Sequence, residues 1–290
     1  MNILQPLCLF VFYIICLQSN AAEVDTVKIQ SEAMQITYKA AIIKPASYAK
    51  NGKNYPVVYL LHGAMGHFNT WLNKTPNKSF LTSLADQYNT IIVMPEGEIY
   101  SWYIDSPFDK KSQFETHVSK EVIEKIDALY RTVKSKTGRA ITGYSMGGHG
   151  ALYLSARHPE VYSCAGSISG GVDMNYTKFK ISGDLSGTKR EFERILGTSN
   201  PESEIFKQNS IVNMLELLKK NAMPISIDCG VYDYLIDVNR SLHEKMVAQN
   251  IPHDYTERSG GHTWDYWENA LTYQFVFFDK IFKKNGAKEV

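Results

Sequence analysis

A serine flanked by glycines is the residue in this sequence best suited to do chemistry. Residues 143–148 read Gly-Tyr-Ser-Met-Gly-Gly, which fits the Gly-x-Ser-x-Gly pattern of a nucleophile elbow with Ser145 as the nucleophile. In that motif a strained turn between a strand and a helix lifts the serine hydroxyl clear of the backbone. The strand-like residues 140–142 precede the motif, and residues 148–154 favour a buried helix after it. The pattern is weak alone and becomes specific only with suitable partners downstream.

The first partner is a general base. A serine hydroxyl needs a histidine to accept its proton, and in chains with this elbow the order is serine, then Asp or Glu, then histidine. Of eight histidines, His243, His253 and His262 lie well downstream. His262 stands in a glycine-rich loop after a strand-like segment, so we expect it to be the base. His243 falls in a polar helical pattern and His253 starts the strand; a merely structural role for His262 is the alternative.

The second partner is a carboxylate that fixes the tautomer of the histidine. Asp233 follows the strand-like residues 224–230, which places it at the sheet edge where ligands bind in open α/β folds. Asp228 lies inside that strand. Asp237 falls at the start of the next helix, where an acid interacts favourably with the helix dipole. Asp233 is therefore the predicted acid.

An oxyanion needs two backbone N–H donors, each typically worth about 3–4 kcal/mol. The amide of Met146, directly after the nucleophile, is the first candidate. The second should come from the loop after an early central strand, and the apolar residues 56–61 followed by His-Gly-Ala place the Ala64 amide there. His62 ends this strand, and we expect it to brace the loop rather than to catalyse.

Composition and residue spacing argue against several classes of binding partner. The formal net charge is +1 without basic clusters, which argues against nucleic-acid binding. Neither the Cys nor the His spacing resembles a zinc site, so we expect no metal; the serine mechanism requires no cofactor, and we expect none. Nothing in the sequence specifies an oligomeric state.

Residues 1–21 resemble a secretory signal peptide. They contain no charged side chain, residues 7–17 are almost wholly apolar, and small residues precede a cleavage site after Ala21. Eleven apolar residues fall short of the roughly 20 that span a bilayer, so we expect no stable membrane insertion after cleavage and a secreted or periplasmic protein. The absence of a Lys or Arg before the apolar stretch departs from the usual signal-peptide pattern. An uncleaved anchor is the alternative. After cleavage of residues 1–21, the two cysteines that remain are Cys164 and Cys229. Each lies in a strand-like stretch, and we expect either two buried thiols or a disulfide between them.

The elements that must position these residues alternate along the chain. Strands are expected at 27–30, 34–44, 57–61, 90–94, 140–143, 165–169, 225–228 and 253–257, and helices at 78–88, 114–131, 147–157, 238–249 and 263–282. This order predicts an α/β fold with a mostly parallel central sheet, an antiparallel N-terminal strand pair and helices on both faces. Residues 22–290 suit one domain. The irregular residues 171–213 are expected to form a cap or pocket wall, with a structural connector as the alternative.

Aromatic residues gather near the proposed site and could stack a sugar or a hydroxycinnamate ring, although most aromatics in any chain pack the core. They are Phe68, Trp71, Trp102, Tyr103, Tyr144, Tyr232, Tyr234 and Trp264. From this set, Tyr144 and Trp264 are predicted to bind substrate.

Four motifs carry a family resemblance. They are Leu-Leu-His-Gly at 60–63, Ser-Trp-Tyr-Ile-Asp-Ser-Pro at 101–107, the elbow at 143–148 and Gly-His-Thr-Trp at 261–264. Over residues 27–282 the chain resembles the esterase D family, which includes S-formylglutathione hydrolases, tributyrin esterases, feruloyl and acetyl xylan esterases, and mycolyltransferases. The resemblance implies an α/β-hydrolase fold, a Ser145–Asp233–His262 triad and an oxyanion hole of Ala64 and Met146. It also puts the loop 101–107 beside the site, which adds Trp102 and Tyr103 to the predicted substrate-binding residues.

The expectation that follows is a secreted serine carboxylesterase acting through an acyl-enzyme on short-chain or carbohydrate-linked acetyl or feruloyl esters. An acyltransferase of the same fold is one alternative. An S-formylglutathione hydrolase-like thioesterase fits less well, because the chain is expected to be exported. A non-catalytic binding module of the same fold is the alternative from a different class.

Overall fold

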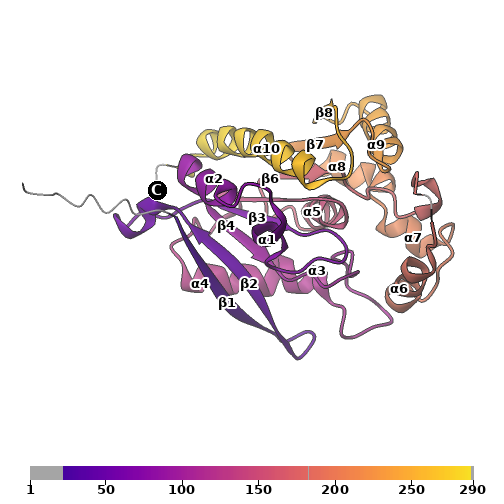
Figure 1. Ribbon diagram of the computed structural model, residues 1–290, viewed down its shortest axis with the longest axis horizontal. Helices are drawn as coiled ribbons and strands as arrows, with labels where there is room; N and C mark the ends of the chain where they lie inside the picture. Colours follow the sequence, from indigo (N-terminus) through magenta and orange to yellow (C-terminus); the bar gives the residue numbers. More distant parts are fainter. Residues whose placement is uncertain (1–21, 182, 289–290) are drawn as a thin grey trace, which may run out of the picture.

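The computed structural model describes residues 22–181 and 183–288, so the expected signal peptide lies outside the described residues. Within these described residues, eight strands form one sheet in the order β1-β2-β4-β3-β5-β6-β7-β8 (Figure 1). The strands are β1 (Glu23–Ser31), β2 (Ile36–Lys44), β3 (Val57–Leu61), β4 (Ile91–Pro95), β5 (Arg139–Gly143), β6 (Cys164–Ile168), β7 (Ile225–Gly230) and β8 (Asp254–Arg258).

The sheet is antiparallel only at its N-terminal side. β1 pairs with β2, and β2 with β4, in antiparallel register, while the remaining neighbours are parallel. The central strands β3, β4, β5 and β6 consist entirely of buried residues, because helices cover both faces and neither side of these strands meets water. The predicted fold class is therefore confirmed.

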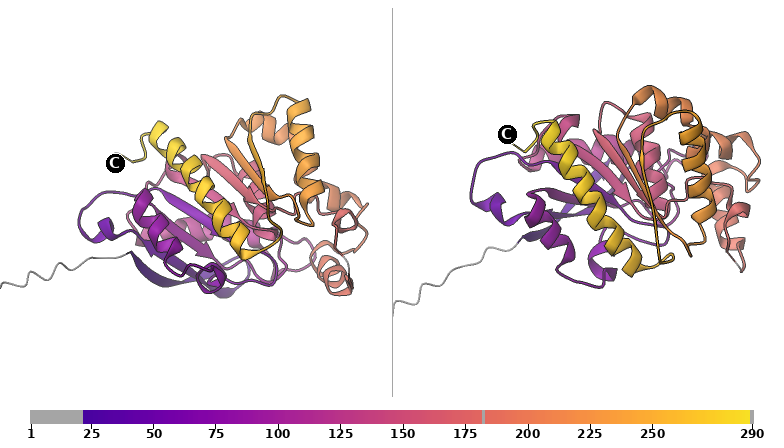
Figure 2. Two further views of the ribbon diagram at one scale, coloured as in Figure 1. Left: turned by 45° about the horizontal axis from the view of Figure 1, so that its top comes forward. Right: turned by 90° about the horizontal axis from the view of Figure 1, so that it is seen from above.

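Helices cover the two faces of the sheet as two separate layers (Figure 2). α1 (Thr70–Lys74), α2 (Phe80–Tyr88) and α10 (Trp264–Lys284) pack on one face. The other face is covered by α4 (Ile123–Leu129), α5 (Met146–Arg157), α8 (Leu215–Asn221) and α9 (Ile236–Ala248). Strand alternation divides β3 between the layers: Val57, Tyr59 and Leu61 face one core, and Val58 and Leu60 the other.

The structure differs from the predicted elements where helices are short or irregular. The expected helix 114–131 consists of α3 (Phe114–Thr116), a π-helical segment (His117–Val122) and α4. Residues 171–213 contain α6 (Ser186–Leu196) and α7 (Glu204–Asn209), which lie at one end of the molecule in Figure 1. α1, α7 and α8 have five, six and seven residues, which is too short for hydrophobic periodicity to reveal.

The two cysteines in the described part of the chain are free thiols. Cys164 and Cys229 are buried in the neighbouring strands β6 and β7. Burial raises the pKa of the Cys164 thiol to about 12, so it stays protonated and unreactive at neutral pH. Within residues 22–181 and 183–288, no helix combines the length and the apolar character that crossing a membrane requires.

Candidate active site

Ser145 occupies a strained turn between β5 and α5. Its φ of 56° and ψ of −120° lie outside the usual regions for a non-glycine residue, and the turn is held by a 2.9 Å hydrogen bond from its N–H to the Ile168 carbonyl. Glycine is required nearby. A Cβ on Gly143 would lie 2.7 Å from the Gly147 backbone, and a Cβ on Gly147 would lie 2.6 Å from the His62 carbonyl oxygen. This geometry fits a nucleophile elbow.

His262 and Asp233 reach Ser145 from the ends of β8 and β7. The Nε2 atom of His262 lies 3.0 Å from Ser145 Oγ, and Nδ1 lies 2.9 and 3.1 Å from the two Asp233 carboxylate oxygens. Asp233 has no exposed side-chain surface, whereas 14% of the His262 side chain is exposed. Because an ionised carboxylate only accepts, Nδ1 must carry the proton. Nε2 is then free to accept the hydroxyl proton of Ser145, as a general base must.

The two other acids considered have different partners. Asp228 is buried in β7, where it accepts hydrogen bonds from Tyr266, at 2.6 Å, and from Arg258. Asp237, at the start of α9, pairs with Lys180 on the surface at 2.8 Å. Both acids therefore have structural partners of their own.

The other downstream histidines bond to each other. His243 Nδ1 lies 2.8 Å from His253 Nε2, and the His243 ring stacks on Tyr255 at 4.1 Å between centroids. This pair sits beside β8, the edge strand of the sheet. Its position leaves His262 as the downstream histidine in contact with Ser145.

The backbone N–H groups of Ala64 and Met146 have no protein acceptor among the described residues. Met146 is the first residue of α5, where helical N–H groups lack partners and the helix dipole is positive. Ala64 follows β3, whose end lies against the elbow, since a Cβ on Gly147 would touch the His62 carbonyl. Free donors in this position suit an oxyanion.

Trp102 and Tyr103 lie in the loop after β4 with positive φ values of 53° and 58°. Trp102 is 6% exposed and Tyr103 is fully buried. The Tyr103 hydroxyl donates to the His62 carbonyl at 2.9 Å. Tyr103 therefore supports the chain at the end of β3 and, in this conformation, presents no surface to a ligand, contrary to the contact that we expected.

Tyr144 and Trp264 belong to one aromatic cluster on the side of the elbow that faces α10. Tyr144 stacks on Trp267 with centroids 4.1 Å apart, and Trp264 meets Tyr144 at 4.9 Å and Trp71 at 5.4 Å. Tyr144 is buried, whereas Trp264 is partly exposed. Of this pair, Trp264 has the surface that a substrate could reach.

Tyr234 belongs to the aromatic set expected near the site, although it was not among the predicted substrate-binding residues. Its ring lies over His262 with centroids 4.3 Å apart. Burial, reinforced by the nearby Asp233 anion, raises the pKa of Tyr234 to about 12. The phenol is therefore uncharged at neutral pH. Its position directly after Asp233 could have identified it as a site residue, because the loop that carries the acid also passes the histidine.

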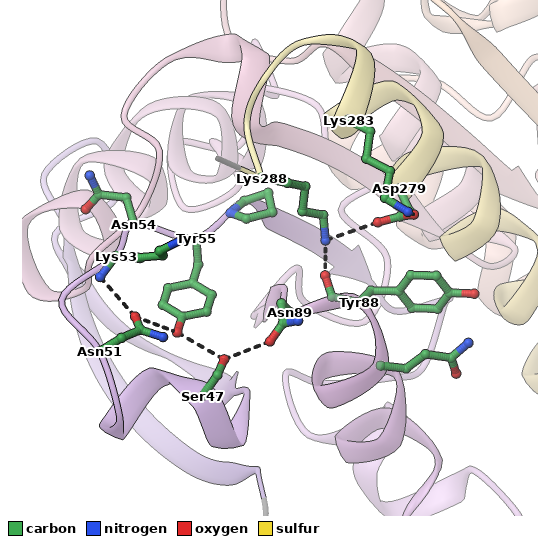
Figure 3. A pocket seen from close by; sticks show the side chains of 12 residues that line it. Ser47, Asn51, Lys53, Asn54, Tyr55, Tyr88, Asn89, Asp279, Lys283 and Lys288 are labelled. Atoms are coloured by element: carbon green, nitrogen blue, oxygen red, sulfur yellow. Dashed lines mark hydrogen bonds and ion pairs between the residues drawn. The ribbon is translucent and has the colours of Figure 1, made fainter. Parts of the chain in front are cut away.

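A polar pocket of about 590 Å³ lies elsewhere (Figure 3). It includes Tyr55, which precedes β3, whereas Ser145 follows the parallel strand β5; the pocket is therefore at the opposite edge of the sheet. Its lining side chains bond one another: Tyr55 donates to Ser47 at 3.0 Å and Ser47 to Asn89 at 2.8 Å. In the described part of the chain, no group of three His, Cys, Asp or Glu residues is arranged to hold a metal ion.

Comparison with known proteins adds independent findings. Residues 31–278 match a family model described as "Putative esterase". An acetyl esterase from Caldicellulosiruptor saccharolyticus is 27% identical over 238 residues, which cover 80% of this chain and 86% of that protein. The diacylglycerol acyltransferase/mycolyltransferase Ag85B from Mycobacterium leprae is 25% identical over 286 residues, covering 86% of this chain and 81% of that protein.

A solved structure of a ferulic acid esterase superposes on this chain with a TM-score of 0.75 at 25% identity. The superposition covers 91% of this chain and 100% of that chain. The likeness thus extends over most of this chain.

Proposed function

This chain belongs to the esterase family and is a serine ester hydrolase, and from that premise we propose that Ser145, His262 and Asp233 hydrolyse carboxylic esters through an acyl-enzyme. One observation carries the proposal: a single imidazole contacts the serine oxygen at 3.0 Å and the buried carboxylate at 2.9 Å. That arrangement is what activates an otherwise weak hydroxyl nucleophile.

The steps follow from the tautomer of His262. Ser145 Oγ attacks the ester carbonyl carbon while its proton passes to Nε2 of His262. Asp233 stabilises the imidazolium that forms, and its hydrogen bond to Nδ1 keeps the ring in place. The imidazolium then protonates the departing alcohol, leaving the acyl group on Ser145. A water activated by His262 attacks that acyl group and releases the acid.

The oxyanion of each tetrahedral intermediate is held by the amides of Ala64 and Met146. Support comes from the lack of protein acceptors for these two N–H groups among the described residues. Trp264 supplies apolar surface for the substrate, with Tyr144 packed behind it, and Trp102 contacts the substrate through the small part of its side chain that is exposed. Tyr103 acts by positioning the loop, because its ring is fully buried.

The substrates are short-chain or carbohydrate-linked acetyl or feruloyl esters, and the protein is exported. The curated acetyl esterase and the solved ferulic acid esterase support this class of acyl group, as does the aromatic cluster around Tyr144 and Trp264. Residues 22–290 act as one domain, in which residues 171–213 form a wall of the site. Export rests on the signal-peptide pattern of residues 1–21.

Acyl transfer is the second candidate, because a relative of 25% identity is named a diacylglycerol acyltransferase/mycolyltransferase. The same acyl-enzyme would serve both reactions. A transferase excludes water and favours an acceptor alcohol, so the ratio of free acid to transferred ester, measured with and without an added sugar or glycerol, separates the two. Predominant transfer would replace hydrolysis as the assigned reaction.

The first test is hydrolysis of 4-nitrophenyl acetate and methyl ferulate by the wild type, Ser145→Ala and Ser135→Ala. Ser135 is an exposed serine remote from the elbow and controls for the loss of a hydroxyl. We expect turnover to fall at least about 1,000-fold in Ser145→Ala only, together with loss of fluorophosphonate labelling. Equal rates in the three proteins would reject Ser145 as the nucleophile and favour a binding module. Preference for S-formylglutathione over both esters would favour the thioesterase alternative.

A further inference from the structure

The loop that carries Trp102 is held in a strained conformation. Between β4 and α3, Glu98, Trp102 and Tyr103 all have positive φ values, of 57°, 53° and 58°. Side chains disfavour this region of backbone space, and such residues persist only where the surrounding structure holds them. On one side of the loop, the Tyr103 hydroxyl donates a hydrogen bond to the His62 carbonyl. The other side of the loop needs a second support.

α6 provides that second support. Phe192 of α6 stacks on Trp102, with centroids 5.3 Å apart and an interplanar angle of 29°. The Ser106 hydroxyl donates to the Ile195 carbonyl of the same helix at 2.6 Å. α6 therefore contacts the loop both through an aromatic stack and through its backbone.

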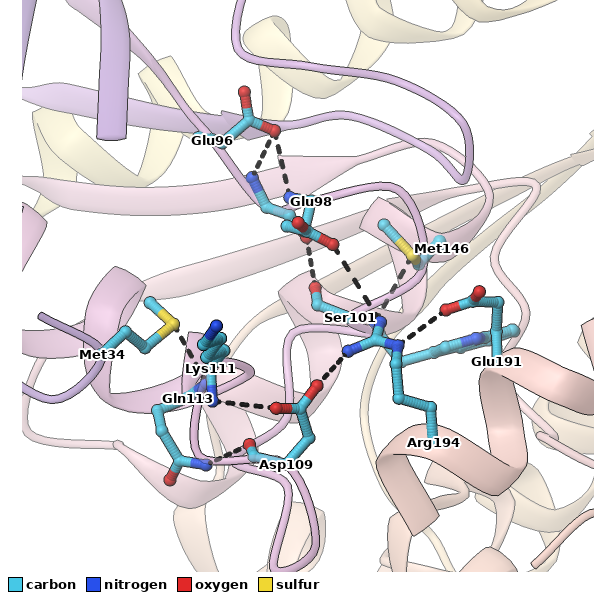
Figure 4. A network of polar contacts seen from close by, with 12 residues as sticks. Met34, Glu96, Glu98, Ser101, Asp109, Lys111, Gln113, Met146, Glu191 and Arg194 are labelled. Carbon is cyan, nitrogen blue, oxygen red and sulfur yellow. Dashed lines mark hydrogen bonds and ion pairs between the residues drawn. The ribbon is translucent and has the colours of Figure 1, made fainter. Parts of the chain in front are cut away.

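Arg194 of α6 also links this helix to the loop, through ion pairs with carboxylates. Its guanidinium hydrogen-bonds Asp109 and, at 2.8 Å, Glu191, and it lies 4.0 Å from Glu98 (Figure 4). Asp109 and Glu98 belong to the loop, whereas Glu191 belongs to α6. One cation thus holds together three carboxylates on two elements. Without it, these like charges would repel each other and push the loop away from α6.

The loop in turn touches the elbow. The Trp102 N–H points at the Met146 sulfur, 3.4 Å away, and the Trp102 carbonyl lies 3.1 Å from Nδ1 of His149. The indole also meets the His149 ring edge-on at 5.2 Å. Met146 and His149 are the first and fourth residues of α5, directly after Ser145. A shift of Trp102 would therefore reach the helix start that carries a proposed oxyanion donor.

We propose that Arg194 is a positioning residue for ester hydrolysis, which fixes α6 against the loop 96–113 and thereby holds Trp102 against Met146. This inference rests on the proposed function of Ser145 and Met146. Arg194 is suited to the role because its side chain is one-third exposed, at 34%, and so contributes little to the apolar core. Phe192, in contrast, is 1% exposed and belongs to that core, so its loss would affect folding as well as position.

The test compares Arg194→Met with Arg194→Lys and with Arg190→Met, a control on an exposed part of the same helix. With 4-nitrophenyl acetate we expect Arg194→Met to lower kcat about ten-fold with KM changed less than about two-fold, because a misplaced donor acts on the transition state. Arg194→Lys keeps the charge but loses the planar fork, so it should recover part of that loss. Arg190→Met should match the wild type.

A double-mutant cycle with Asp109→Asn separates positioning from a general loss of stability. Each single variant should lower kcat, and the double variant should be no slower than the slower single one, because both act on one contact. Asp109→Asn also tests the contact if Arg194→Met does not fold. Wild-type kcat in Arg194→Met, or additive losses in the cycle, would overturn the inference while the Ser145→Ala result leaves the proposed function standing. Activity that survives Ser145→Ala would overturn both.

Discussion

The backbone N–H of Gly97 donates to Nε2 of His62 at 2.9 Å, which joins the loop after β4 to the loop after β3. Since that nitrogen accepts, the proton of the neutral ring is on Nδ1, where it faces the Gly63 carbonyl at 2.9 Å. His62 is 1% exposed. One buried imidazole thus sets the spacing between the Ala64 amide and the loop of Trp102.

Replacing that imidazole should loosen both loops. His62→Phe keeps a ring but leaves the Gly97 N–H with only Glu96, at 3.3 Å, as an acceptor. We expect about 1–2 kcal/mol lower unfolding free energy and a kcat about ten-fold lower, since the Ala64 donor would no longer be held. Urea denaturation and ester kinetics measure the two effects. His67→Phe, at a histidine with 58% of its side chain exposed, is the control; equal kcat values in both variants would contradict the bracing role.

Loss of the carboxylate behind His262 should disable the base while leaving the fold intact. In Asp233→Asn the amide can donate to Nδ1, which favours the tautomer that has its proton on Nε2, so Ser145 loses its acceptor. We expect kcat to fall by about 10⁴ with ester substrates. Asp237→Asn, on the surface beside Lys180, should retain wild-type activity. Comparable losses in the two variants would reject Asp233 as the acid.

Two glycine-to-alanine substitutions should change the stability of the fold in opposite directions. Gly147→Ala places a Cβ 2.6 Å from the His62 carbonyl oxygen, so the backbone of the elbow must shift, and we expect about 2–3 kcal/mol of destabilisation. Gly187→Ala lies in the first turn of α6, where nothing comes within 4 Å. It should stabilise by about 0.5–1 kcal/mol, because the unfolded chain loses freedom. Thermal unfolding compares them; a harmless Gly147→Ala would refute the tight approach of β3 to the elbow.

The buried His149 should make stability depend on pH. Its ring is fully buried between the carbonyls of Trp102 and Asn209, and burial lowers its pKa to about 4. The unfolded chain takes up that proton near pH 6.5, so between about pH 6.5 and pH 4 the folded state binds fewer protons. The unfolding free energy should therefore fall as pH decreases through this window, by up to about 3 kcal/mol from this group.

His149→Gln removes this titration, so its stability should decline less steeply than that of the wild type between pH 6.5 and 4. Urea unfolding at several pH values measures the difference between the two slopes, which isolates His149 from the carboxylates that titrate in both proteins. Parallel slopes would show that the folded state takes up this proton as readily as the unfolded chain.

Local pattern was enough to predict the sheet and the turn that carries Ser145. Apolar runs mark strands buried on both faces, and the glycines at 143 and 147 follow from a turn that leaves no room for a Cβ. These features depend on the backbone and on neighbours close in sequence. The order serine, acid, histidine also follows from the chain itself, and it directed attention to Asp233 and His262.

Only the tertiary structure decided which side chains meet. Asp228, Asp233 and Asp237 lie within ten residues of one another, yet only Asp233 contacts His262, because the chain turns at the end of β7 toward the loop after β8. Tyr103 was expected at the substrate and is buried, and Arg194 acquires its partners only when α6 docks on a loop some 85 residues earlier. Such contacts form when segments distant in sequence pack together. Local secondary-structure propensity therefore does not predict them.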